Sequence, residues 1–112
     1  MHSRQSLAAT FVDIATQAPQ RLAVWNDDHD LTYGELLARA TQVARALRQR
    51  DILPDAPVGL AMPRSLDSVT AVLGVLLAGG AYVPIDPEYP EERQRFIQSD
   101  SGAQVILVQS GA

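Results

Sequence analysis

The 112-residue sequence predicts an α/β fold: a short, mostly parallel sheet with flanking helices, preceded by an N-terminal helix and a small hairpin. Two patterns carry this prediction. Apolar residues recur at helical spacing over residues 36–47. An uncharged strand pattern at 58–62 then precedes an apolar helix pattern and a second strand pattern, which is the order of a βαβ unit. A hydrophobic content of 46% without long charged runs is typical of one small globular domain, here residues 1–112.

The first elements are a helix and a hairpin. Residues 6–17 carry apolar side chains at helical spacing (Leu7, Phe11, Ile14 and Ala15), and the helix should stop at Ala18, because a residue before proline is pushed out of the helical region. The stretch "RLAVWNDDHDLTY" alternates through Leu22 and Val24 and then holds turn-forming residues, which predicts two strands joined by a tight turn. Within this hairpin we expect Trp25 to be a partly buried anchor.

The next helix carries the most specific local signal. Thr32 and Glu35 have capping-box spacing, in which the hydroxyl bonds the amide three residues on and the carboxylate reaches back to the cap amide. Leu31 and Leu36 have the placement of a hydrophobic staple. One apolar stripe follows (Leu36, Leu37, Ala40, Val43, Ala44 and Leu47), and a helix from about Tyr33 to Gln49 is predicted.

A strand, helix and strand follow. "VGLAMP" alternates large and small residues without charge, which predicts a buried strand of a parallel sheet. Ser65 should cap a helix with a broad apolar face (Leu66, Val69, Val72, Leu73, Leu76 and Leu77) that ends at Gly79-Gly80. Residues 81–85 then form a short strand.

The stretch "GGAYVPIDPEYPEER" is stiffened by prolines at every third position. Pro84 and Pro87 cannot donate to a ladder, so this strand should lie at a sheet edge or strand end. Pro90 has the fixed φ suited to the first helical position, and acidic residues favour the helix start. The helix should end at Gly102, and "QVILVQ" should be another buried strand.

Composition excludes several classes of function. The net charge of −4, the pI near 4.9 and scattered arginines without any lysine argue against a nucleic-acid partner. The absence of cysteine excludes disulfides and thiolate metal sites and is compatible with a reducing cytoplasm. The start "MHSRQSL" lacks a secretory pattern, and the apolar run of residues 69–83 is too short to span a bilayer. We therefore expect a soluble cytoplasmic protein with no membrane partner.

Two groups of residues near predicted turns are candidate ion sites. Arg64 and Ser65 lie between a strand end and a helix start, where α/β sheets bind anions, but a surface arginine beside a helix cap is the commoner arrangement. The cluster of Asp27, Asp28, His29 and Asp30 has the composition of a hard-cation site. Its spacing matches no calcium loop, so a solvated hairpin turn is favoured.

The remaining candidates also favour structural roles. Four carboxylates lie near Pro90, namely Asp86, Glu88, Glu91 and Glu92, and they invite an acid/base interpretation. That chemistry needs burial and an opposing pair of groups, so a role in capping the following helix is preferred. His2 is expected in a mobile terminus, and Tyr82 and Tyr89 are expected to pack. We therefore predict no catalytic, cofactor-binding or metal-binding residue in this chain.

Two motifs carry a family resemblance. "LTYGEL" at 31–36 and "LLAGGAYVPIDPEYPEERQRF" at 76–96 resemble the first and second core motifs of nonribosomal peptide synthetase adenylation domains. The flanking stretches at 11–30 and 97–109 are also similar to that family, so the resemblance covers nearly the whole chain. One departure is Leu77, where the family commonly has lysine.

The resemblance implies a partial, truncated adenylation domain, comprising the opening part of its large N-terminal subdomain. Complete members of the family use ATP and Mg²⁺ to convert an amino acid to its aminoacyl adenylate and pass it to a carrier-protein thiol. The family's phosphate loop, amino-acid pocket, nucleotide contacts and C-terminal lysine have no counterpart here. The isolated chain is therefore expected to be catalytically incomplete and to bind no cofactor by itself.

Three interpretations remain open. The chain is the front of an adenylation domain, partnered by the remainder of that domain or by adjacent condensation and carrier domains. Alternatively, it is a non-catalytic remnant that acts as a spacer or docking module and associates with a neighbour or with itself. A third possibility is a free-standing small ligand-binding protein that shares only ancestry with the family.

Overall fold

The computed structural model describes residues 4–25 and 29–109. The elements in chain order are α1 (Arg4–Gln17), β1 (Leu22–Trp25), β2 (Asp30–Thr32), α2 (Tyr33–Arg48), β3 (Pro57–Ala61), α3 (Leu66–Leu77), β4 (Ala81–Pro84), α4 (Glu91–Ser101) and β5 (Val105–Val108). β1 and β2 form an antiparallel pair, and the other three strands form a parallel sheet in the order β4-β3-β5. The predicted α/β class, hairpin and short parallel sheet are confirmed.

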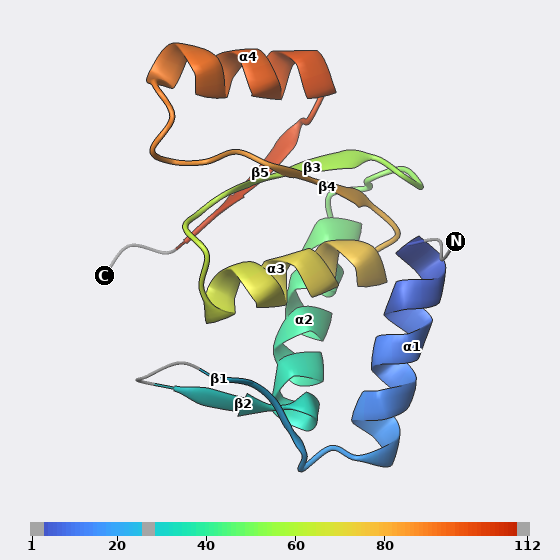
Figure 1. Cartoon of the computed structure of the whole chain (residues 1–112). Coiled ribbons are helices and arrows are strands. Elements are labelled where there is room, and N and C mark those ends of the chain that lie inside the picture. The colour runs from blue at the N-terminus through green and yellow to red at the C-terminus, as the bar shows by residue number, and fades with distance from the viewer. Residues whose placement is uncertain (1–3, 26–28, 110–112) are drawn as a thin grey trace.

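The parallel sheet separates two helical layers (Figure 1). α2 and α3 lie on one side of it and α4 on the other, while the hairpin and α1 extend the α2/α3 side. β3 is the central strand, with Gly59 opposite Val83 on one neighbour and Ile106 on the other. The predicted edge position of β4 is confirmed. Pro84, which has no backbone N–H to donate, therefore lies in a strand that forms hydrogen bonds with a neighbour on one side only.

α2 begins as its sequence predicts. The Glu35 amide donates to Thr32 Oγ1 at 3.2 Å and the Thr32 amide donates to Glu35 Oε1 at 2.9 Å, which completes the capping box. Leu31 and Leu36 are both buried in one cluster, consistent with the predicted staple. The helix ends at Arg48, one residue before the predicted Gln49.

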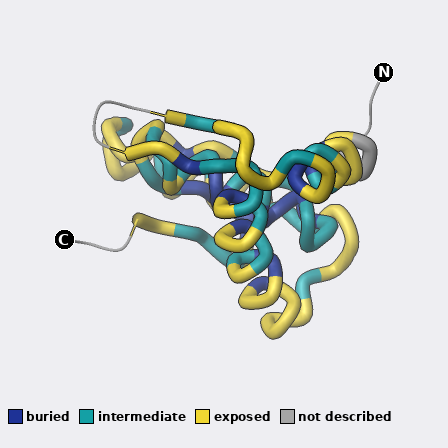
Figure 2. The backbone as a smooth tube through the Cα atoms, turned by 90° about the horizontal axis from the view of Figure 1, so that it is seen from below, coloured by how far each residue is buried: buried dark blue, intermediate teal, exposed yellow. Residues whose placement is uncertain are grey.

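The core consists of two clusters that meet along α2 and α3, and buried positions gather in the middle of the molecule (Figure 2). The first joins α1 and the hairpin to α2 (Phe11, Ala15, Leu31, Leu36 and Ala40). The second joins α2 and α3 to the central strand (Leu47, Val58, Leu60, Ala71 and Val75). α3 belongs to both halves of the core, because its half-buried Leu66, Val69, Leu73 and Leu77 pack against the first cluster.

Several expectations about burial are wrong. Trp25, expected as a partly buried anchor, is 67% exposed, because β1 is covered by its hairpin partner and not by a second layer at its end. Tyr82, expected to pack, is 44% exposed on the edge strand β4. β5, expected to be buried, is a half-buried edge strand whose last residue Val108 is 67% exposed, since it pairs on one side only.

α4 departs from its prediction at one end. Pro90 is the N-cap with extended ψ, so the first helical residue is Glu91 and not the proline. Gly102 ends the helix in the left-handed conformation at φ 74°, as predicted. No residue of α4 is buried, and Phe96 is 65% exposed. The helix is thus the least covered element of the described chain.

Candidate functional site

The carboxyl ends of the parallel strands form the edge of the sheet where α/β proteins most often hold ligands. β3 ends at Ala61 and leads through Arg64 into α3, while β5 ends at Val108 beside the start of the same helix. The side-chain Nε2 of Gln109 donates to Asp67 Oδ2 at 3.0 Å and ties the end of β5 to the first turn of α3. A polar hollow of about 430 Å³ lies here, between the hairpin, α2 and the start of α3.

The serines at this helix start bond each other. Ser65 Oγ accepts from the Ser68 amide at 3.1 Å and donates to the Pro63 carbonyl at 3.1 Å. The Ser65 amide in turn donates to Ser68 Oγ at 2.8 Å, which completes a second capping box. The sequence predicted Ser65 as a cap but not its reciprocal partner. Because these groups already have partners within the cap, the structure favours the capping role over the candidate anion site.

Glu35 lines the same hollow but is held as a helix cap. Hydrogen bonds from the Thr32 amide and hydroxyl lower the pKa of the Glu35 carboxyl below its ordinary value, with a smaller contribution from Arg39. An ionised carboxylate with bound amide donors is a poor general acid. Asp67 accepts the bond from Gln109, so the two carboxylates support helix starts and not proton transfer.

Only half of the candidate cation cluster lies within the described residues. Asp27 and Asp28, like His2, lie outside them. His29 and Asp30 border the polar hollow at the start of β2. Within residues 4–25 and 29–109, no group of three or more His, Asp or Glu side chains has the arrangement of a metal site.

The four carboxylates near Pro90 are exposed and are spread along the loop before α4 and the first turn of that helix. Asp86 Oδ1 accepts from the Glu88 amide at 2.9 Å, and Glu91 pairs with Arg95 at 3.3 Å. No side chain forms a capping hydrogen bond at the start of α4, so the predicted capping role is wrong. The predicted acidic residues at the helix start are present, because Glu91 and Glu92 lie in the first turn. The acid/base interpretation fails with it, because none of these four residues is buried.

Sequence reasoning missed Gln94, which fixes the proline-rich loop. Its Nε2 donates to the carbonyls of Pro87 at 3.1 Å and Tyr89 at 2.8 Å. Tyr89 is half-buried, as expected of a packing residue, and the Arg93 guanidinium lies 4.2 Å from its ring centroid. The sequence signal that could have indicated this role is the position of Gln94, one helical turn after Pro90.

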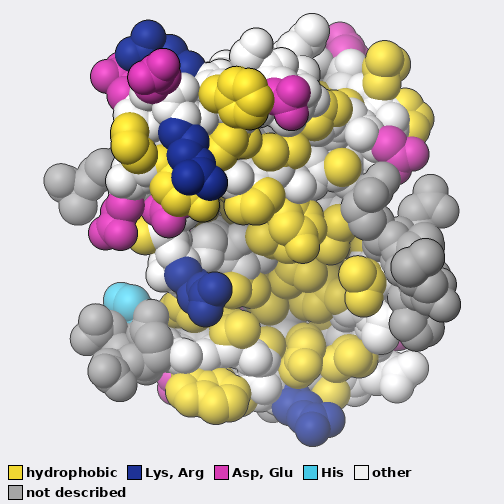
Figure 3. Space-filling view, turned by 45° about the horizontal axis from the view of Figure 1, so that its top comes forward, with side chains coloured by type: hydrophobic (Ala, Val, Ile, Leu, Met, Phe, Trp, Pro, Cys, Tyr) yellow, Lys and Arg dark blue, Asp and Glu magenta, His cyan; other side chains and the backbone are white. Residues whose placement is uncertain are grey.

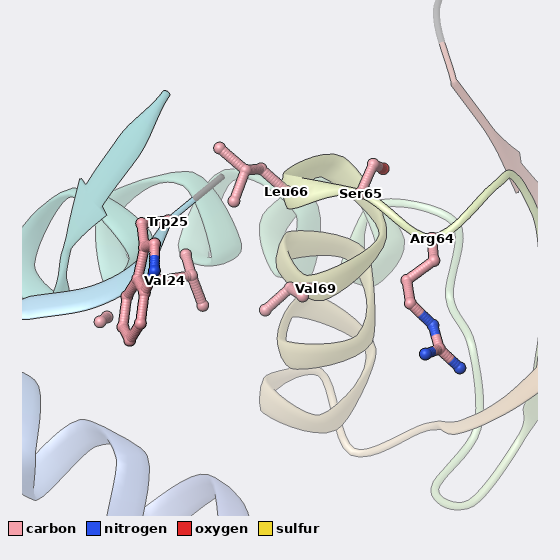
Figure 4. A pocket seen from close by; sticks show the side chains of 7 residues that line it. Val24, Trp25, Arg64, Ser65, Leu66 and Val69 are labelled. Atoms are coloured by element: carbon pink, nitrogen blue, oxygen red, sulfur yellow. The ribbon is translucent and has the colours of Figure 1, made fainter. Parts of the chain in front are cut away.

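Two hollows that α3 lines are mainly apolar. Hydrophobic side chains gather across the middle of the face shown in Figure 3. One hollow of about 410 Å³ lies between Val24 and Trp25 of β1 and Leu66 and Val69 of α3, with Arg64 beyond the helix start (Figure 4). A second, of about 580 Å³, lies among Leu7, Val72, Leu73, Leu76, Ala81 and Tyr82. Such surfaces provide contact area and lack the convergent polar groups of a catalytic pocket.

No helix within the described part of the chain is long and apolar enough to cross a membrane.

Comparison with known proteins gives one consistent result. Residues 11–112 match the family described as AMP-binding enzyme. Bacitracin synthase 1 of Bacillus licheniformis is 50% identical over 97 residues, 87% of this chain but 2% of its own length. Tyrocidine synthase 3 of Brevibacillus parabrevis is 47% identical over 105 residues, 94% of this chain and 2% of its own. The chain thus spans a small part of these relatives.

Solved structures share the fold. The AMPPNP-bound crystal structure of the nonribosomal peptide synthetase FmoA3 is 36% identical, with a TM-score of 0.88, over 96% of this chain and 11% of that one. The N-terminal subdomain of Klebsiella oxytoca NpsA, in complex with 3-hydroxybenzoyl-AMSN, gives a TM-score of 0.83 at 24% identity, over 91% of this chain and 26% of that one.

Proposed function

The chain belongs to the AMP-binding enzyme family, and from that premise we propose that it forms the opening part of the N-terminal subdomain of an amino-acid-activating adenylation domain. The resemblance to nonribosomal peptide synthetases is confirmed by relatives that are 50% and 47% identical to it. In the proposed complete domain, ATP and Mg²⁺ convert an amino acid to its aminoacyl adenylate, which is loaded onto a carrier-protein thiol.

One observation carries the proposal. Nearly the whole chain, 96% of it, superposes on a nonribosomal peptide synthetase with a TM-score of 0.88 at 36% identity. This likeness supports the assignment of the chain to one region of a larger enzyme. The solved fusion of NpsA with ThdA, an artificially fused adenylation-PCP di-domain, supports a carrier domain as the adjacent partner.

The proposed role of these residues is that of a scaffold. A triphosphate needs several free donors or cationic side chains. At the start of α3 the two serines bond each other, and Arg64 is the cation that borders the hollow between α3 and β1. Mg²⁺ needs converging oxygen ligands, and the described residues offer no such cluster. The nucleotide and its metal would therefore be held by other parts of the domain.

Amino-acid-dependent ATP–pyrophosphate exchange tests this role. The purified 112-residue chain should give no exchange above the blank with any proteinogenic amino acid. The same chain, joined to the stretch that follows the matched region in bacitracin synthase 1, should gain exchange with at least one amino acid. Exchange by the isolated chain would overturn the scaffold role, and a folded but inactive fusion would count against the adenylation-domain proposal.

A second candidate function is a non-catalytic docking or spacer module. It is favoured by large hydrophobic side chains that stay exposed on three separate elements, namely Trp25, Phe96 and Val108. Such a module would associate with a neighbouring domain or with itself. The reading frame beyond Ala112 discriminates the two: a phosphate loop there supports the adenylation domain, whereas a condensation or carrier domain supports the module.

A further inference from the structure

The carboxyl end of β5 is joined to α3 by a bond between two side chains. Gln109 Nε2 donates to Asp67 Oδ2 at 3.0 Å, across 42 residues of the sequence. The last pair of the β3–β5 ladder is Ala61 with Val108, so this bond lies just beyond the paired part of the strand. Figure 1 shows that β3 and β5 end at the same edge of the sheet, beside the start of α3. The bond therefore acts at the point where the chain leaves the sheet.

The sheet itself holds this end of β5 only from one side. β5 is an edge strand that pairs with β3 alone. Val105 and Leu107 pack against the second core cluster, whereas Val108 is 67% exposed. A strand end with exposed side chains and backbone bonds on one side opens more readily than a buried strand. A contact beyond the ladder can therefore decide where this end lies.

Asp67 has a rigid support. It lies in the first turn of α3, whose N-cap is Ser65. The reciprocal bonds between Ser65 and Ser68, at 2.8 and 3.1 Å, fix the backbone of this turn. A hydrogen bond to a carboxylate is roughly twice as strong as one between neutral groups. The start of α3 is thus a fixed point against which Gln109 can be placed.

The bond also lies at the edge of the sheet where α/β proteins most often hold ligands. Asp67 and Gln109 both border the polar hollow of about 430 Å³. Both also border a smaller hollow of about 230 Å³, which Met62 and Leu107 line. The bonded pair is therefore part of the wall of both hollows, and a shift of the strand end would change this edge.

We propose that Asp67 is a positioning residue for the adenylation reaction of the complete domain. Through Gln109 it fixes the end of β5, from which the rest of that domain continues, and so places the parts that hold the nucleotide. This inference rests on the proposed function, in which those parts lie outside residues 1–112. A displacement of about 1 Å far from the reacting atoms can lower a rate about a hundredfold. A single bond at this point can therefore affect the reaction.

The alternative role for Asp67 is stabilisation of the helix start alone. A carboxylate in the first turn interacts favourably with the helix dipole, and that effect needs its charge. The proposed role needs an acceptor oxygen that reaches Gln109. Asp67→Asn separates the two roles, because asparagine removes the charge and keeps an acceptor oxygen.

The first test is amino-acid-dependent ATP–pyrophosphate exchange by the fusion with the following stretch of bacitracin synthase 1, below the unfolding midpoint of every variant. Asp67→Ala and Gln109→Ala should each lower kcat at least about tenfold. The double variant should lose no more than the slower single variant, because both substitutions remove the same bond. Asp67→Asn should keep most of the rate. Glu91→Ala is the matched control, since Glu91 lies in the first turn of α4 and pairs with Arg95 of its own helix.

An unchanged kcat in Asp67→Ala would overturn the inference, and so would a double variant that loses the product of the two single effects. An Asp67→Asn variant as slow as Asp67→Ala would also overturn it, because that result assigns the loss to the charge at the helix start.

The second test is hydrogen–deuterium exchange of the Val105–Val108 amides in the 112-residue chain, which needs no activity. The amide exchange rates should rise at least about threefold in Asp67→Ala and Gln109→Ala and stay unchanged in Asp67→Asn. Unchanged rates in both alanine variants would overturn the inference even if the unsubstituted fusion is inactive. An inactive fusion together with the expected amide exchange would count against the proposed function alone.

Discussion

Replacing Gly74 by alanine should destabilise the protein, although alanine is the better helix former. A Cβ at this position would lie 2.5 Å from Cβ and Cγ1 of Val43 and 3.0 Å from the Ala40 carbonyl oxygen. Favourable carbon contacts begin at about 3.5 Å, so α2 and α3 would have to separate by roughly 1 Å. Two of the three opposing atoms, the Val43 Cβ and the Ala40 carbonyl, are fixed to the backbone and cannot rotate away.

The expected magnitude is a balance of two terms. Overpacking a well-packed interface costs about 1–3 kcal/mol, and the backbone-fixed neighbours place Gly74→Ala near the upper end of that range. The gain in helix propensity offsets about 1 kcal/mol. A net loss of about 2 kcal/mol would lower the midpoint of thermal unfolding by roughly 10 °C for a domain of this size.

Urea unfolding followed by circular dichroism at the helix signal measures this loss. Gly79→Ala is the control, because its added Cβ meets nothing within 4 Å and its φ of 85° alone should cost about 1 kcal/mol. A Val43→Gly background removes both 2.5 Å contacts and leaves only the 3.0 Å contact with the Ala40 carbonyl oxygen, so Gly74→Ala should cost clearly less there than in the unsubstituted chain. If Gly74→Ala stabilises the unsubstituted chain, the deduced spacing of α2 and α3 is wrong.

Three further predictions concern the helix ends and are measured by the same unfolding assay. Thr32→Ala and Ser65→Ala each remove a cap hydroxyl and should cost about 1 kcal/mol; a loss near zero for both would contradict the capping boxes. The pKa of Glu35 is lowered by folding, so its contribution is present above the ordinary value of 4.5 and is lost as pH falls through the lower folded pKa. Glu35→Gln should flatten that acid-side slope, and an unchanged slope would refute it. Arg48→Met removes the 2.7 Å bond to the Leu77 carbonyl and should cost about 1 kcal/mol, whereas an unchanged midpoint would show that the bond contributes nothing.

The sequence by itself determined the elements whose signals are local. The capping box of Thr32 and Glu35 is completed by atoms three residues apart, so its spacing alone predicts the start of α2. The left-handed end of α4 at Gly102 and the edge position of Pro84 likewise follow from the backbone chemistry of single residues. The two core motifs also identified the family, which the relatives confirm.

Only the tertiary structure decided which apolar residues are covered. Val58 and Val108 both belong to apolar strand patterns, yet one is buried in the central strand and the other is exposed at an edge. The difference depends on strand order, which is set by contacts between segments distant in the chain. The bond from Gln109 to Asp67 has the same origin. The local sequence pattern shows how apolar a segment is, whereas its burial depends on which other segments of the chain pack against it.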